Sequence, residues 1–232
     1  MATAPSLREV FRDLKNPHIF EEWRGEWAIA LMFRLPSQFI AWFFMRLGWS
    51  PTAVTGLGFL CALLIPVAAI WLPLQAAIWG VVVLGAFFQM FDCADGTMAR
   101  ISGRSSVLGA DLDFLGDMFY YGSLYVSVGL IADRILETAH FWALIGAVAV
   151  AGRYLARLVR EQIKKRIGEG EPGPFKLSDL PNSFIAGLSG LIPFGVFAGE
   201  QIGWVLIALI VYSAMDIIDA FMPMRKPPYR GG

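Results

Sequence analysis

The feature that most constrains this chain is a series of apolar runs close in length to the roughly 20 residues that a helix needs to cross a bilayer. Only 16% of the residues are charged and 56% are hydrophobic, whereas a soluble domain averages about 25% charged residues. The sequence therefore predicts an all-α integral membrane protein with six transmembrane helices. The expected spans cover residues 51–72, 75–92, 106–131, 140–159, 183–198 and 201–222.

The segment before the first span has a different character. Ser50 and Pro51 suit a helix start, with serine as the N-cap and proline at the first helical position. Residues 26–47 are rich in Trp and Phe but include Arg34 and Pro36, which favours an amphipathic helix in the membrane interface. The alternative is a further span kinked at Pro36. We expect three regions: an interfacial segment over 1–49, a six-helix transmembrane catalytic domain over 50–222 and a cytoplasmic tail over 223–232.

The distribution of basic residues predicts the orientation. Six spans place both termini on one side, and every Lys and Arg except Arg134 then falls on or near that side. The positive-inside rule identifies it as the cytoplasm. We therefore expect a multi-pass protein of the inner (cytoplasmic) membrane with its polar site facing the cytoplasm. The net charge is zero, so no basic field indicates a nucleic-acid partner.

A polar motif interrupts the second and third apolar runs. It reads D-x2-D-G-x2-A-R-x8-G-x3-D-x3-D. At about 100° per residue, the members of each run fall on one helix face. The short connection makes the two helices neighbours, so the acidic faces should meet. The positions are Asp92, Asp95, Gly96, Ala99, Arg100, Gly109, Asp113 and Asp117.

Ionisable groups inside a membrane are costly and indicate function. Four carboxylates that converge at low dielectric raise one another's pKa unless cations offset them. Oxygen-only ligands select hard ions such as Mg²⁺ or Mn²⁺, commonly shared with substrate phosphates. An arginine beside them neutralises phosphate charge. The chemistry indicated is phosphoryl transfer, with one carboxylate accepting a proton.

The eight motif positions and their spacing resemble the signature of the CDP-alcohol phosphotransferase family. The resemblance implies six transmembrane helices, a homodimer and transfer of a substituted phosphate from a CDP-linked alcohol to a second alcohol, with release of CMP. It also implies residue roles. Asp117 would be the general base, the four aspartates Asp92, Asp95, Asp113 and Asp117 would hold a metal pair, and the nucleotide site would be formed by Gly96, Ala99, Arg100 and Gly109.

Several other polar residues are candidates for binding phosphate. Arg153 and Arg157 line one face of the fourth predicted span, where they would either bind phosphate or anchor the helix at lipid headgroups. Arg104 and Ser105, between the two motif helices, have a similar claim. We expect Thr52 or Thr55 either to touch the nucleotide or to serve local capping.

The remaining acids are interpreted structurally. Asp216 and Asp219 are expected to cap a helix or to pair with Arg or Lys. Asp111 is expected on the far side of its helix from Asp113, where it favours the helix N-terminus.

The sequence favours a polar phosphorylated acceptor such as inositol phosphate or glycerol phosphate, with CDP-diacylglycerol as donor and membrane lipids around it. Serine is an alternative acceptor, and the reverse arrangement pairs a soluble CDP-alcohol with diacylglycerol. Two other classes stay open: a UbiA-type prenyltransferase and a cation carrier. Against the first, the acids form one cluster rather than two, and against the second, the first and fifth spans contain no acid.

Overall fold

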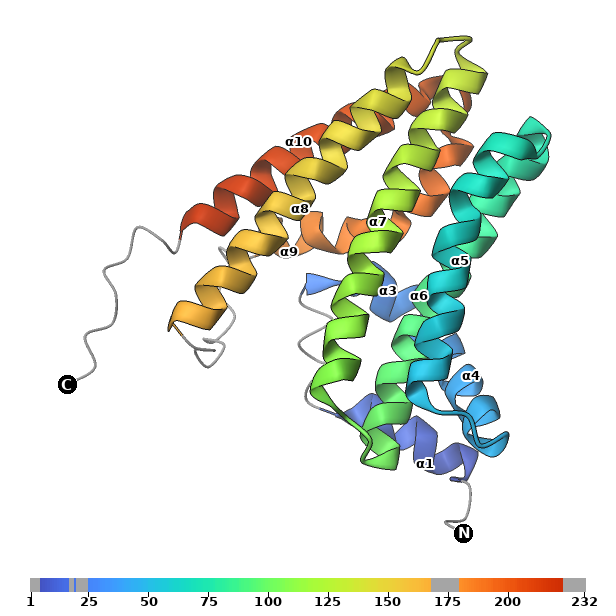
Figure 1. The fold of residues 1–232 in the computed structure, drawn as a ribbon, viewed down its shortest axis with the longest axis vertical. Helices are drawn as coiled ribbons and strands as arrows, with labels where there is room; N and C mark the ends of the chain where they lie inside the picture. The colour runs from blue at the N-terminus through green and yellow to red at the C-terminus, as the bar shows by residue number, and fades with distance from the viewer. Residues whose placement is uncertain (1–4, 17–18, 20–24, 168–179, 223–232) are drawn as a thin grey trace.

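The computed structural model describes residues 5–16, 19, 25–167 and 180–222, and within these ranges it contains helices and no strands. The tail expected over 223–232 lies outside the described residues. The elements are α1 (Leu7–Arg12), η1 (Asp13–Lys15), α3 (Trp27–Met32), α4 (Arg34–Arg46), α5 (Pro51–Trp71), α6 (Leu74–Ser102), α7 (Val107–Ile135), α8 (Phe141–Ile167), α9 (Leu180–Gly187), η3 (Leu188–Gln201) and α10 (Ile202–Phe221). Figure 1 shows long helices side by side, with α1 and α4 near one end of the bundle and α3 farther along it.

The long helices form one bundle. α5 packs on α6 and α7, while α8 packs between α7 and α10. Tyr120, Leu124, Tyr125 and Val128 on α7 are buried in its core. Large apolar side chains such as Trp71 are exposed on its outside, as expected for a protein whose surface faces lipid rather than water. The bundle therefore agrees with the predicted integral membrane protein.

Five helical segments are long and apolar enough to cross a membrane, among the residues described. The last, Leu188–Phe221, is 34 residues long and covers residues 188–198 of the fifth predicted run and 201–221 of the sixth. Its helical geometry breaks at Gly199, where φ is +56°, and η3 and α10 run in opposite directions (Figure 1). The prediction of six separate spans is thus not confirmed, because η3 alone has 14 residues.

Side-chain caps fix where the two helices at the motif end begin. Ser50 Oγ accepts a hydrogen bond from Ala53 N at 3.2 Å, as the Ser-Pro pair predicts. Ser106 Oγ accepts one from Gly109 N at 3.0 Å. Both caps supply an acceptor for a backbone N–H that the first helical turn leaves unpaired.

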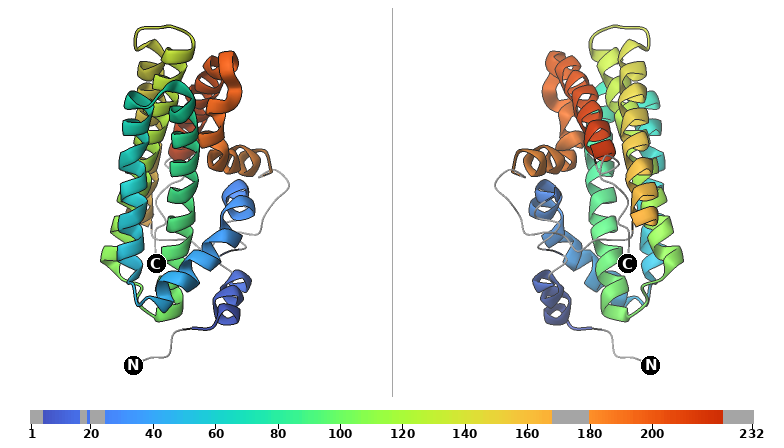
Figure 2. Two further views of the ribbon diagram at one scale, coloured as in Figure 1. Left: turned by 90° about the vertical axis from the view of Figure 1, so that its right-hand side faces the viewer. Right: turned by 90° about the vertical axis from the view of Figure 1, so that its left-hand side faces the viewer.

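The N-terminal part lies beside the cytoplasmic end predicted for the bundle. Figure 2 shows α1, α3 and α4 along one side of the long helices, and α4 packs against α6. No described helix in this part qualifies as a span. On α4, the exposed face carries Leu35, Phe39 and Phe43, whereas Arg34 and Gln38 are buried against the bundle. That polarity suits an interfacial helix, but the position in the interface stays a prediction.

Glycines allow α7 and α8 to approach closely. A Cβ built on Gly129 would overlap the Trp142 carbonyl oxygen and the Ala143 Cα, and one on Gly146 would overlap the Tyr125 carbonyl oxygen. Small residues at such crossings are typical of packed transmembrane helices. Asp133 also joins the pair, since its carboxylate accepts hydrogen bonds from Trp142 N at 3.0 Å and Ala143 N at 2.9 Å.

This crossing gives a test of the packing. Gly129→Ala forces backbone apart, so we expect it to destabilise the protein by about 1–3 kcal/mol. In detergent, the melting temperature should fall by about 2–4 °C for each kcal/mol. Gly56→Ala is the matched control, because nothing lies within 4 Å of its added Cβ. Equal melting temperatures for the two variants would contradict the close crossing.

Candidate active site

The motif lies where α6 ends and α7 begins. The turn between them starts at Gly103, which has a φ of +64° that L side chains rarely adopt. Arg104 N donates to the Ala99 carbonyl at 3.0 Å and closes the end of α6. The reversal brings the two motif halves face to face at the end of the bundle where α1 lies (Figure 1).

A cleft of about 310 Å³ lies between these helix ends and the start of α5. It gathers motif side chains from both helices together with the connecting residues, and this set contains all the predicted nucleotide positions except Arg153 and Arg157. Its lining includes Asp95, Gly96, Ala99, Arg100, Arg104, Ser105, Gly109 and Asp113. The structure therefore brings these residues together, and their roles in binding stay predictions.

Thr55 enters the same cleft from α5. Its Oγ1 donates to Asp95 Oδ2 at 2.5 Å and also lies 3.2 Å from the Pro51 carbonyl. The threonine thus positions a motif carboxylate, a role that its spacing in the sequence does not reveal.

The acidic centre lies deeper in the bundle. A small space of about 10 Å³ is lined by Asp92, Asp95 and Asp113, with Gly116 on its wall. Asp92 interacts electrostatically with the other three motif aspartates, Asp117 included. The four predicted carboxylates therefore form one electrostatic cluster.

The donor set of this cluster suits a hard divalent cation, since it consists of carboxylate oxygens around one space. Yet no three carboxyl, imidazole or thiol groups in the described part of the chain converge closely enough to hold a metal ion. The ligand types fit Mg²⁺ or Mn²⁺, while the predicted metal pair is not shown.

Arg157 supplies positive charge at the cluster. Its Nη2 lies 2.7 Å from Asp117 Oδ2, which makes a hydrogen-bonded ion pair between α8 and α7. The residue also lines a second cavity of about 520 Å³, whose wall includes Asp113, Asp111 and Arg160. Asp111 therefore shares a cavity with Asp113, although helix periodicity separates them, and Phe114 lines the same cavity.

Arg153 and Arg160 have other partners. Arg153 is only 8% exposed, donates to Tyr212 Oη at 2.9 Å and stacks its guanidinium 3.9 Å from the centre of the Tyr121 ring. Arg160 pairs with Asp216 at 2.5 Å and with Asp219 at 2.9 Å, which confirms the expected pairing of these acids. Two arginines on α8, Arg153 and Arg157, are predicted to bind phosphate. Among the residues described, Arg157 forms an ion pair with a motif aspartate, whereas Arg153 contacts tyrosines.

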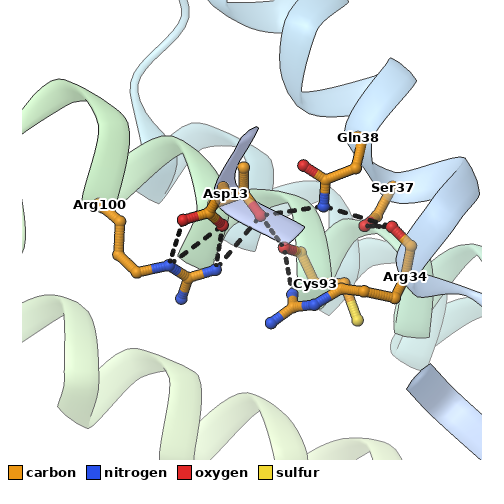
Figure 3. Close-up of polar contacts among 7 residues, drawn as sticks. Asp13, Arg34, Ser37, Gln38, Cys93 and Arg100 are labelled. Atoms are coloured by element: carbon orange, nitrogen blue, oxygen red, sulfur yellow. Dashed lines mark hydrogen bonds and ion pairs between the residues drawn. The ribbon is translucent and has the colours of Figure 1, made fainter. Parts of the chain in front are cut away.

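A polar network that sequence patterns do not indicate joins the N-terminal part to the motif (Figure 3). Arg34 Nη1 donates to the Cys93 carbonyl at 3.1 Å, and Gln38 Nε2 lies 3.3 Å from Thr97 Oγ1. Asp13 binds Arg100 with a shortest distance of 2.8 Å. These partners are more than 50 residues apart in the chain, so no local spacing could have identified them.

The charge of Asp13 depends on this contact. Burial alone would raise the pKa of its carboxyl, but hydrogen bonding and attraction from Arg100 hold that pKa below its usual range. Because the folded-state pKa is the lower one, the stabilisation is present above the unfolded pKa and is lost as the pH falls through the folded value.

These features define a class of protein: a helical membrane protein with a carboxylate cluster beside an arginine-lined cleft, suited to phosphate chemistry. The sequence profile of the family described as CDP-alcohol phosphatidyltransferase matches residues 48–186, which include the whole motif. The chain belongs to the CDP-alcohol phosphatidyltransferase family. This membership places it among transferases of substituted phosphate groups and leaves the UbiA-type and cation-carrier alternatives without support.

Curated relatives agree with the family. A phosphatidylinositol phosphate synthase of Corynebacterium glutamicum is 28% identical over 72% of this chain and 74% of its own length. One from Streptomyces avermitilis is 36% identical over 47% of this chain and 43% of its own. The CDP-diacylglycerol–serine O-phosphatidyltransferase of Saccharomyces cerevisiae is 30% identical over 48% and 45%. The matches to the last two span less than half of those proteins' length.

The carboxylate cluster predicts an unusual stability effect. In Asp92→Asn a neutral amide replaces an acid whose ionised form the three neighbouring carboxylates disfavour, so without metal the variant should be more stable than the wild type. With EDTA present, we expect its melting temperature in detergent to rise by about 2–4 °C, equivalent to about 1 kcal/mol. Asp111→Asn is the control, because it removes an exposed charge from the start of α7. A lower melting temperature for Asp92→Asn alone would argue against repulsion within the cluster.

Proposed function

We propose that this protein transfers a phosphatidyl group from a CDP-linked lipid alcohol, such as CDP-diacylglycerol, to a polar acceptor alcohol and releases CMP. The observation that carries the proposal is the position of Asp113, which lines both the 310 Å³ cleft and the 520 Å³ cavity. Two spaces that meet at one carboxylate suit a reaction between two substrates.

The cleft supports binding of the donor nucleotide. Gly96 and Gly109 place no side chain in the cleft and so leave room for a ligand, while Arg100 and Arg104 supply positive charge. Guanidinium groups pair well with phosphate oxygens. The donor would enter with its diphosphate beside these arginines and its reacting phosphorus toward Asp113.

A divalent cation is part of the proposal. Asp92, Asp95, Asp113 and Asp117 would hold Mg²⁺ or Mn²⁺, which would offset the carboxylate charges and polarise the phosphate oxygens. The oxygen-only donor set and the shared space at Asp92, Asp95 and Asp113 support this assignment.

Asp117 would act as the general base. It takes the proton of the acceptor hydroxyl, whose oxygen attacks the phosphorus attached to the lipid alcohol; the bond from that phosphorus to the bridging oxygen breaks, and CMP departs with the bridging oxygen. Its ion pair with Arg157 favours the ionised carboxylate that a base requires. Arg157 would also orient the acceptor, because it lines the second cavity.

The acceptor is proposed to be a phosphorylated polyol such as inositol phosphate or glycerol phosphate. Arg157 and Arg160 both line the second cavity, and two of the relatives are named phosphatidylinositol phosphate synthases. Serine is the second candidate, because the cavity also includes Asp111 and Glu161 and the yeast relative is named for serine.

The cellular arrangement belongs to the same proposal. The basic residues gather at the motif end, which supports a site facing the cytoplasm with both termini on that side. Multi-pass insertion in the inner (cytoplasmic) membrane and a homodimer are also inferred, the latter from the family resemblance. Sedimentation in detergent would test the dimer.

The activity is tested by CMP release from CDP-diacylglycerol by purified protein in detergent with Mg²⁺. Acceptors are inositol phosphate, glycerol phosphate, inositol and serine. We expect CMP with a phosphorylated polyol, its loss on chelation by EDTA and a decrease of at least about 100-fold in Asp117→Asn. Glu200→Gln, an exposed acid far from the motif in the chain, is the control.

Other outcomes would change the proposed acceptor, the proposed donor or the proposed activity. CMP release with serine alone would change the acceptor. Release only from a soluble CDP-alcohol with diacylglycerol would reverse donor and acceptor. No release in either arrangement from folded protein would contradict the proposed activity.

A further inference from the structure

Asp13 binds a motif residue from outside the motif. We propose that Asp13 is a positioning residue for the donor. It binds Nε and Nη2 of the Arg100 guanidinium, so that the third nitrogen, Nη1, faces the phosphates of the CDP-linked alcohol. This inference rests on the function proposed above and adds a determinant of donor binding that lies in the N-terminal segment.

The contact between Asp13 and Arg100 uses two nitrogens of the guanidinium. Nε lies 3.2 Å from Oδ1 and 3.3 Å from Oδ2, and Nη2 lies 2.8 Å from Oδ2. The Asp13 side chain is only 6% exposed. Such a two-point contact fixes the plane of the guanidinium as well as its place.

The third nitrogen of Arg100 lies at the cleft. A Cβ built on Gly96 would come within 3.3 Å of Nη1, and both residues line the 310 Å³ cleft. The absence of a side chain at position 96 therefore leaves room for Nη1. While Asp13 engages Nε and Nη2, Nη1 lies where a ligand in the cleft would meet it.

The residues around Asp13 pack against α4 and α6. Val10 is fully buried with Met98 of α6, and the Phe11 ring packs edge-on against Phe39 of α4 at 5.0 Å between centroids. Arg100 Nη2 also lies 3.3 Å from Thr97 Oγ1. Figure 3 shows Asp13 of the N-terminal segment, Gln38 of α4 and Arg100 of α6 close together. Asp13 is thus held by packing that does not involve Arg100.

A bound arginine must give up side-chain freedom, which weakens binding unless that freedom is already lost. Holding Arg100 in advance would therefore strengthen donor binding without any contact between Asp13 and the donor. A purely structural ion pair would hold the N-terminal segment to the bundle and leave nucleotide affinity unchanged.

The test compares Asp13→Asn with wild type in CDP binding, measured by calorimetry in detergent, and in donor and acceptor kinetics. We expect the Kd for CDP and the KM for CDP-diacylglycerol to rise about threefold to tenfold, with kcat and the acceptor KM within twofold of wild type. Asp13→Glu keeps the carboxylate and should recover part of the affinity. Glu9→Gln is the matched control, because it removes a charge from α1 but retains a capping-box residue.

A second measurement uses the wild-type protein and does not depend on how the variants fold. By linkage, if docking of Asp13 on Arg100 improves CDP affinity, CDP must stabilise that docking by the same free energy. Hydrogen exchange of residues 7–15 should therefore slow when CDP binds.

Unchanged or tighter CDP binding in Asp13→Asn would overturn the inference, as would CDP binding without slower exchange in residues 7–15. Either result leaves the proposed function intact, since wild type still binds CDP. Failure of wild type to bind CDP would overturn the proposed nucleotide site and, with it, the inference.

Discussion

Electrostatic repulsion among four carboxylates is the constraint on which this structure depends. Two neighbouring helices, α6 and α7, place Asp92, Asp95 and Asp113 around one small space in the bundle, and Asp117 interacts electrostatically with Asp92. Isolated charges are costly there, so the surroundings must supply compensation. Part of it comes from the chain itself, as Arg157 of α8 pairs with Asp117. The rest would come from divalent cations and substrate in the function that we propose.

The surrounding architecture serves to hold this unstable centre in place. Close crossing of α7 and α8 at Gly129 and Gly146 sets the position of Arg157 relative to Asp117. On another side of the bundle, α4 turns its polar face toward α6 and its apolar face outward, and the N-terminal segment contacts the motif there. Compensating charge therefore arrives from elements distant in sequence, which explains why the site needs the whole fold.

Local rules predicted much of this arrangement. The cap at Ser50 and the common faces of the motif residues follow from patterns within a few positions. Long-range pairs such as Asp13 with Arg100 could not be predicted, because the sequence offers each of these side chains many oppositely charged partners and does not distinguish among them. Asp111 and Asp113 line one cavity although periodicity separates them on the helix, because a cavity beside a helix can include residues from more than one face. The break between the fifth and sixth runs lies at Gly199, whose positive φ interrupts the helical geometry between η3 and α10.

The claim that the carboxylate cluster exists to bind divalent cations is tested most directly by electron paramagnetic resonance of Mn²⁺ added to purified protein in detergent, with CDP present. We expect bound Mn²⁺ with the spin coupling of two ions about 3.5–4 Å apart, and loss of that coupled signal in Asp113→Asn. An absence of bound Mn²⁺, or a coupled signal unchanged by Asp113→Asn, would contradict it.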